Sequence, residues 1–199
     1  MMVTDSAASV PDQRTAILDA AAAVITEHGM GGLTVTAVMG HAKISRTAFY
    51  RRFDDIPDVV SGLLERLRVE LVQAAGDWFR DEIGSPEIIH GNLLAVARTF
   101  HRHGAVLEAI VMAAGSDPRV RDDWDNLIEA FRIRTEAAIE RDQAAGAIST
   151  AIQAHDTALA LTWLDERAAT RLLGRSRAGT PEEYANLLTP IWTRVLFGG

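Results

Sequence analysis

Residues 33–53, LTVTAVMGHAKISRTAFYRRF, constrain the fold more than any other stretch of this chain. They read as two short helices joined by a tight turn. The apolar residues spaced to bury one side of the pair are Leu33, Val35, Val38, Met39 and Ile44. Thr34 and Ser45 each precede one helix, where a hydroxyl can accept a hydrogen bond from a first-turn backbone N–H. The stretch therefore predicts a compact two-helix unit with one buried side.

The second of these helices, which starts near Ser45, is basic. Four positive side chains and no acid lie between Lys43 and Arg52, interleaved with hydroxyls and one tyrosine. Such a helix can lie in a DNA major groove, with arginines on base edges or phosphates and hydroxyls on the backbone. A solvated basic helix packed on a core explains the same charges, so charge alone leaves both interpretations open. The candidate DNA-binding residues are Thr34, Thr36, Lys43, Ser45, Arg46, Thr47, Tyr50, Arg51 and Arg52.

The run ISRTAFYRRF, with Leu33-Thr34-Val35 eleven residues before Ile44, resembles the helix-turn-helix of the TetR family of one-component repressors. The resemblance implies an N-terminal head that binds a double-stranded DNA operator. Lys43 stands where the family usually has Gly, and a left-handed turn there costs a non-glycine residue about 1 kcal/mol. Ile56 stands where the family usually has a phosphate-contacting Lys. The acids around it, Asp54, Asp55 and Asp58, predict weaker DNA binding than in typical relatives, unless Lys43 partly substitutes for the missing Lys.

Composition and charge fit this interpretation. The 199 residues are 48% hydrophobic and 24% charged, as in ordinary globular proteins. There is no cysteine, which excludes disulfides and zinc-thiolate sites and fits a cytoplasmic protein. The net charge is -7, but residues 14–53 carry five cations against two acids, a local +3 that leaves -10 for the rest. We therefore expect DNA contact at one end of the molecule only.

Helical periodicity continues to the C-terminus without any strand-like alternation, and Gly and Pro clusters divide it. Helices are expected at 12–28, within 33–53, from Pro57 to about Asp81, and at about 86–102, 104–113, 118–145, 151–174 and 181–197. The helix starting at Pro57 would be about 37 Å long, enough to link a head to a body. The fold class predicted is all-α with about nine helices.

The predicted organisation is a disordered tail at 1–11, a three-helix DNA-binding domain at 12–56 and an effector-binding and dimerisation domain at 57–199. The first eleven residues lack both the basic start and the apolar core of a signal peptide. No run of about 18 apolar residues is present, so no membrane association is expected.

Catalytic and metal-binding patterns are weak. His101 and His103 are two residues apart on an expected helix, so their side chains diverge, and no metal site or cofactor is predicted. There is no phosphate-binding loop or nucleophile elbow, and Asp165-Glu166 has no evident catalytic partner. The sequence predicts a protein that is not an enzyme.

The C-terminal half, especially ALALTWLDERAATRLLG and IWTRVLFG, resembles the TetR subgroup typified by the repressor of the mycobacterial ethionamide-activating monooxygenase. That resemblance implies a long apolar ligand pocket. By position it places Trp124, Phe131, Trp163 and Trp192 near the pocket, although any one of these aromatics taken alone is better explained as core. Thr162 and Asp165 stand where the relatives have asparagines. His90 and Arg134 replace aromatics, which implies a more polar pocket.

The sequence thus predicts a dimeric repressor that binds a palindromic operator and is modulated by a small apolar or amphipathic effector. The alternative is a helical small-molecule-binding protein with weak or lost DNA binding. The last two expected helices are apolar on more than one face, which requires a partner on each. The residues concerned are Leu159, Leu164, Leu172, Leu187, Leu188, Ile191 and Leu196. In the family these two helices form a four-helix bundle with their copies, so a homodimer is expected.

Overall fold

The computed structural model describes residues 12–76, 79, 84–174, 176 and 179–198. Within these residues it contains nine α-helices and no β-strand, which confirms the all-α fold. The predicted tail at 1–11 lies outside the described residues. No helix in the described part of the chain is long and apolar enough to cross a membrane.

The elements follow one another along the chain with short connections. They are α1 (Gln13–His28), a short 3-10 turn (Met30–Gly32), α2 (Val35–Ala42), α3 (Arg46–Tyr50), α4 (Ile56–Ala74), α5 (Pro86–Arg102), α6 (Gly104–Ala114), α7 (Pro118–Ala144), α8 (Ala154–Leu172) and α9 (Pro181–Phe197). Proline occupies the first turn of α4, α5, α7 and α9, where its missing N–H costs no hydrogen bond.

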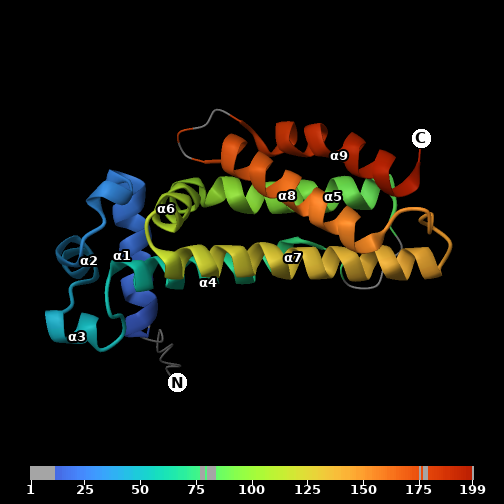
Figure 1. Ribbon diagram of the computed structural model, residues 1–199. Helices are drawn as coiled ribbons and strands as arrows, with labels where there is room; N and C mark the ends of the chain where they lie inside the picture. The colour runs from blue at the N-terminus through green and yellow to red at the C-terminus, as the bar shows by residue number, and fades with distance from the viewer. Residues whose placement is uncertain (1–11, 77–78, 80–83, 175, 177–178, 199) are drawn as a thin grey trace, which may run out of the picture.

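Helices α1, α2 and α3 gather at one end of the molecule, at the left of Figure 1. Helix α1 packs against α2 and also reaches α4 and α6. The apolar face expected for α1, formed by Ile17, Ala21, Val24 and Ile25, is fully buried. This end therefore has a core of its own that continues into the body through α4 and α6.

The connecting helix α4 is shorter than predicted. It ends at Ala74 after 19 residues, whereas the sequence suggested continuation to about Asp81, which lies outside the described residues. Gly76 follows with φ +76°, a left-handed conformation that stops the helix and that glycine adopts without strain. At 1.5 Å per residue α4 is about 28 Å long rather than 37 Å.

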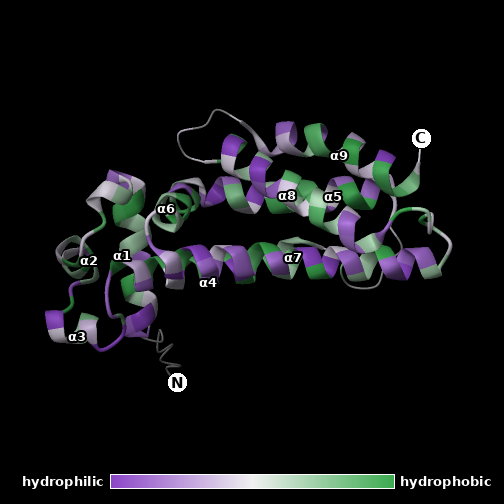
Figure 2. Cartoon of the chain, in the orientation of Figure 1, coloured by the Kyte–Doolittle hydropathy of each residue, from purple (hydrophilic) through white to green (hydrophobic). Residues whose placement is uncertain are grey.

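The body stacks two layers of helices (Figure 1). Helices α5 and α9 pack together, as do α7 and α8, and α4 runs beside α7. Figure 2 shows hydrophobic residues, in green, recurring along α5, α8 and α9. The predicted boundary near residue 56 falls at the start of α4, and the division into two domains stays a prediction.

Candidate functional site

The helix-turn-helix is fixed by two side-chain caps. Thr34 Oγ1 accepts a hydrogen bond from the Ala37 N–H at 3.1 Å at the start of α2. Ser45 Oγ accepts one from the Ala48 N–H at 3.2 Å at the start of α3. Lys43, between the helices, has φ 53° and ψ 44°. The predicted caps and the predicted left-handed turn at Lys43 are therefore confirmed.

Aromatic residues anchor α3 to the rest of the head. Phe49 and Phe53 are buried, with ring centroids 6.2 Å apart, and Val38 of α2 is buried as well. The Arg14 guanidinium of α1 lies over the Phe53 ring at 5.1 Å from its centroid, so this arginine braces the head. With Phe49 pointing inward, the rest of α3 is left on the surface.

All nine predicted DNA-binding residues are exposed. Arg46 is held in place: its guanidinium lies 5.2 Å from the Tyr50 ring centroid, and its Nη2 donates to the Tyr50 hydroxyl at 3.2 Å. Arg52 Nη2 lies 3.7 Å from Asp12 Oδ1 in an exposed ion pair. Arg46 and its neighbours thus form a basic surface, within which Arg52 has an acidic neighbour.

The acids after α3 have structural roles that the sequence did not reveal. Asp55 Oδ1 accepts from the Asp58 N–H at 2.9 Å and so caps α4. Asp58 Oδ2 accepts from the Asp54 N–H at 2.9 Å. Two of the three carboxylates are therefore bound to the backbone at the start of α4. Their expected weakening of DNA binding stays a prediction.

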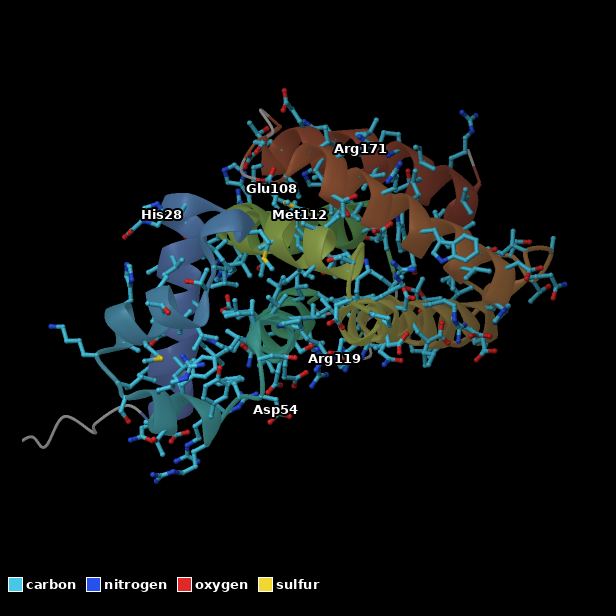
Figure 3. All side chains as sticks on the ribbon, turned by 60° about the vertical axis from the view of Figure 1, so that its left-hand side comes forward. His28, Asp54, Glu108, Met112, Arg119 and Arg171 are labelled. Atoms are coloured by element: carbon cyan, nitrogen blue, oxygen red, sulfur yellow. The ribbon has the colours of Figure 1, made fainter. Side chains whose placement is uncertain are left out.

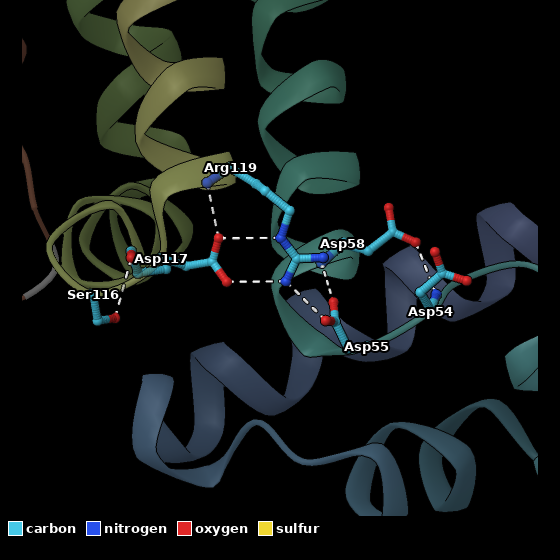
Figure 4. Close-up of polar contacts among 7 residues, drawn as sticks. Asp54, Asp55, Asp58, Ser116, Asp117 and Arg119 are labelled. Atoms are coloured by element: carbon cyan, nitrogen blue, oxygen red, sulfur yellow. Dashed lines mark hydrogen bonds and ion pairs between the residues drawn. The ribbon is translucent and has the colours of Figure 1, made fainter.

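Arg119 joins the head to the body (Figure 4). Its Nη2 donates to Asp55 Oδ2 at 2.8 Å and to Asp117 Oδ2 at 2.9 Å. The hydrogen bond from Arg119 is the main reason that the pKa of the Asp55 carboxyl is lowered, and it lowers the pKa of Asp117 likewise. Since Asp55 caps α4 and Asp117 caps α7, one guanidinium links the N-terminal ends of both helices.

A cavity lies inside the body between α5, α7, α8, α9 and the end of α4. Its empty volume is about 680 Å³, open solvent at its mouth included. The lining residues are Ala75, Phe79, Ile89, Asn92, Leu93, Val96, Phe100, Leu127, Ile128, Phe131, Thr135, Thr162, Asp165, Glu166, Tyr184 and Trp192. The cavity is thus mostly apolar with a polar side formed largely by α8.

Asp165 is the central polar group of this cavity. Its Oδ1 accepts from Trp192 Nε1–H at 2.9 Å, and its backbone oxygen accepts from the Tyr184 hydroxyl at 3.3 Å. The residue keeps some exposed surface, but protein atoms surround the carboxyl. This desolvation raises the pKa of Asp165 to about 8, against the opposing effect of the Trp192 hydrogen bond.

Four of the eight predicted ligand-binding residues line the cavity: Phe131, Thr162, Asp165 and Trp192. The placement of Trp163 was wrong, because its side chain is 60% exposed on the outside of α8. Adjacent residues on a helix point about 100° apart, and on α8 this rotation carries the Trp163 side chain to the outside while Thr162 lines the cavity.

The other three predicted residues also lie off the cavity lining. Trp124 is buried in the core, Arg134 is half-buried on α7, and His90 Nδ1 lies 3.0 Å from Thr189 Oγ1. Sequence reasoning missed Asn92 and Tyr184. Their positions one to four residues from the buried Ile89, Leu93 and Leu188 were the available signal, but that spacing does not distinguish a cavity wall from core.

No cluster of three or more histidine, aspartate or glutamate side chains in the described part of the chain could hold a metal ion. The capped pair α2–α3 with its exposed basic face has the form of a helix-turn-helix DNA-binding unit. The comparisons with known proteins agree. The family model described as "Bacterial regulatory proteins, tetR family" matches residues 17–61, and that described as "Transcriptional regulator EthR, C-terminal domain" matches residues 90–198.

The chain belongs to the TetR family of transcriptional regulators, with a C-terminal domain of the EthR type. It is 26% identical to the HTH-type transcriptional regulator EthR of Mycolicibacterium smegmatis over 193 residues, 94% of this chain and 87% of that protein. For EthR of Mycobacterium tuberculosis the identity is 25% over 195 residues, 94% and 88% of the two chains. Both relatives are named as transcriptional regulators and not as enzymes, in agreement with the class of protein predicted from the sequence.

Solved structures show the same fold. Salmonella enterica GusR superposes with a TM-score of 0.74 at 16% identity, covering 92% of this chain and 95% of that one. The regulatory protein TetR from Rhodobacter sphaeroides gives a TM-score of 0.68 at 20% identity, covering 92% and 98%.

Proposed function

We propose that this protein is a cytoplasmic repressor that binds a palindromic DNA operator as a homodimer and responds to a small apolar or amphipathic effector in the body cavity. The observation that carries the proposal is that α4 joins the two sites. Its first turn follows the basic head, and Ala75, directly after its last residue, lines the cavity. An occupant of the cavity therefore touches the segment that ends the helix on which the head is mounted.

A single α3 is too short to specify a long site, so two heads are needed. A twofold dimer reads two half-sites whose spacing equals that of its recognition helices. Apolar side chains that remain exposed on α8 and α9 supply a surface for the second copy: Trp163, Leu164, Leu187, Ile191 and Val195. We assign the misplaced Trp163 to this surface.

The effector acts by binding one arrangement of the heads better than the other. The start of α4 is held to α7 through Asp55 and Arg119, and its end reaches the cavity. A molecule that pushes on the cavity wall at Ala75 tilts α4 and changes the separation of the two recognition helices.

DNA binding is tested by removing the arginines of α3 and its C-terminal end. Arg46→Ala and Arg51→Ala are each expected to weaken operator binding by about 10- to 100-fold, because each removes an exposed contact worth about 1–3 kcal/mol. The measurement is a gel shift on a DNA fragment recovered from the protein's own genome. The matched control is Arg98→Ala, an exposed arginine of α5 paired with Glu182 at 3.2 Å, which is expected to bind as the native chain does.

Equal affinity of the native chain and both head variants would favour the alternative, a ligand-binding protein that has lost DNA binding. Circular dichroism of the variants separates lost contacts from lost folding, since the side chains of Arg46 and Arg51 are exposed and contribute little to the core.

The link between cavity and head is tested by filling the cavity. Thr162→Trp places a large side chain at a buried cavity-lining position, and we expect operator affinity to change about tenfold while the dimer persists. Ile133→Trp, on the exposed face of α7, is the matched control and should leave affinity unchanged. A folded, dimeric Thr162→Trp variant with native affinity and native ligand response contradicts the assignment of the cavity as the sensor.

A further inference from the structure

We infer that the effector is a lipophilic amine, whose ammonium group pairs with Asp165. The inference rests on the proposed function, because it takes the body cavity as the effector site. It adds the chemical class of the ligand and the residues that select it.

The wall of the cavity selects an apolar body. Half of the lining residues are large aliphatic or phenyl side chains, from α5, α7 and the segment after α4. These are Phe79, Ile89, Leu93, Val96, Phe100, Leu127, Ile128 and Phe131. Burying a hydrocarbon or aromatic group against them is favourable by about 25 cal/mol for each Å² removed from water.

The charge of the lining selects a cation. Asp165 and Glu166 of α8 are its acids, and no Lys, Arg or His is among the described lining residues. Among the described residues the one other titratable lining group is Tyr184 of α9, because the described lining residues of α5 and α7, and Ala75 and Phe79 after α4, include none. When Asp165 is ionised, a carboxylate or phosphate ligand meets like charge in a poorly solvated site, whereas an ammonium group neutralises the carboxylate.

Two buried polar atoms at the cavity lack a partner. Asn92 Nδ2 and Thr162 Oγ1 are inaccessible to solvent and make no hydrogen bond within the described part of the chain. Thr162 is only 6% exposed, and it lies three residues before Asp165, on the same face of α8. An unsatisfied buried group costs about 1–3 kcal/mol, so a ligand that supplies the missing partners is favoured.

The state of Asp165 makes this recognition dependent on pH. In the empty cavity burial raises the pKa of Asp165 to about 8, so the carboxyl is mostly protonated at neutral pH. An ammonium ligand binds the ionised form and must therefore displace a proton. Its affinity should weaken about tenfold for each pH unit below this pKa, whereas that of an uncharged ligand should not.

The test uses three probes that share one apolar body: 4-phenylbutylamine, 4-phenylbutanol and 4-phenylbutanoate. Their binding to the full-length protein is measured by calorimetry at about pH 9, above the Asp165 pKa of about 8. We expect the amine to bind at least about tenfold more tightly than the alcohol, and the carboxylate to bind most weakly. Asp165→Asn should abolish the preference for the amine. Asp156→Asn, an exposed acid in the first turn of the same helix, should retain it.

Equal binding of amine and alcohol, or an amine preference that survives Asp165→Asn, overturns the inference, as does failure of all three probes to bind. If Asp165→Asn does not fold, the pH dependence of amine binding to the native chain decides, and a flat profile overturns the inference. The gel shift with the Arg46 and Arg51 variants needs no ligand. DNA binding by the head is therefore judged separately from the effector. Preferential binding of the alcohol or the carboxylate would overturn the amine inference but would still support the cavity as the effector site.

Discussion

Asp165→Asn is expected to remove the fall in the free energy of unfolding that Asp165 causes in the native protein as the pH rises. The pKa of this carboxyl is about 8 in the folded chain against 3.8 for an unperturbed aspartate, because burial disfavours the charged form. Between these values the folded state holds a proton that the unfolded state has released. The stabilising contribution is therefore complete below pH 3.8 and is lost as the pH rises to about 8.

The effect is large for a single side chain. Each pH unit corresponds to 1.36 kcal/mol, so the free energy of unfolding should fall by about 4 kcal/mol between pH 5 and pH 8 on account of Asp165 alone. The asparagine keeps an acceptor for the Trp192 N–H but buries an amide N–H₂, at a cost of about 1–3 kcal/mol that does not vary with pH. We therefore expect the free energy of unfolding of the variant to rise steadily relative to that of the native chain from pH 5 to pH 8. Above pH 8 the variant should be the more stable of the two.

Urea denaturation of both proteins across this pH range measures the difference directly. The control, Asp156→Asn, removes a carboxylate that is exposed on the same helix and should leave the native pH profile unchanged. A difference between Asp165→Asn and the native chain that is the same at every pH contradicts the raised pKa and, with it, the proton displacement expected for an amine ligand.

The helix-turn-helix could be predicted from the sequence because its determinants are local. The caps at Thr34 and Ser45 and the turn at Lys43 each lie within a few residues of the bonds they form. The all-α fold followed in the same way from periodicity and helix-breaking residues. The end of α4 was misplaced because apolar spacing continues past Gly76, and its left-handed backbone was not evident from that spacing.

The cavity could be predicted only in part because four helices and the end of α4 build it. Trp163 and Trp192 look alike in the sequence, yet one is 60% exposed and the other 4% exposed. The rotation of α8 and α9 about their axes decides this, and it depends on packing between distant segments. Asp55 was read as an unfavourable charge near DNA because its partner, Arg119, is 64 residues away.

Dissociation into monomers is the outcome expected for Leu187→Glu combined with Ile191→Glu. Leu187 is 53% exposed and Ile191 40% exposed, and they lie one turn apart on α9. If a second copy covers them, two unpaired carboxylates become buried, at a cost of several kcal/mol each. Light scattering should give twice 21.6 kDa for the native chain and 21.6 kDa for the variant at micromolar concentration.

Loss of the dimer should also weaken operator binding by at least about 100-fold. Each monomer then contacts one half-site and no longer gains affinity from the second. The matched control is Val111→Glu combined with Met112→Glu, two exposed apolar residues of α6, where Met112 lies on the surface beside Glu108 (Figure 3). This control adds the same charge on α6 rather than on α9 and should remain a dimer that binds DNA. A native chain of monomer mass, or a Leu187→Glu, Ile191→Glu variant that keeps dimer mass, contradicts the α8–α9 surface as the subunit interface.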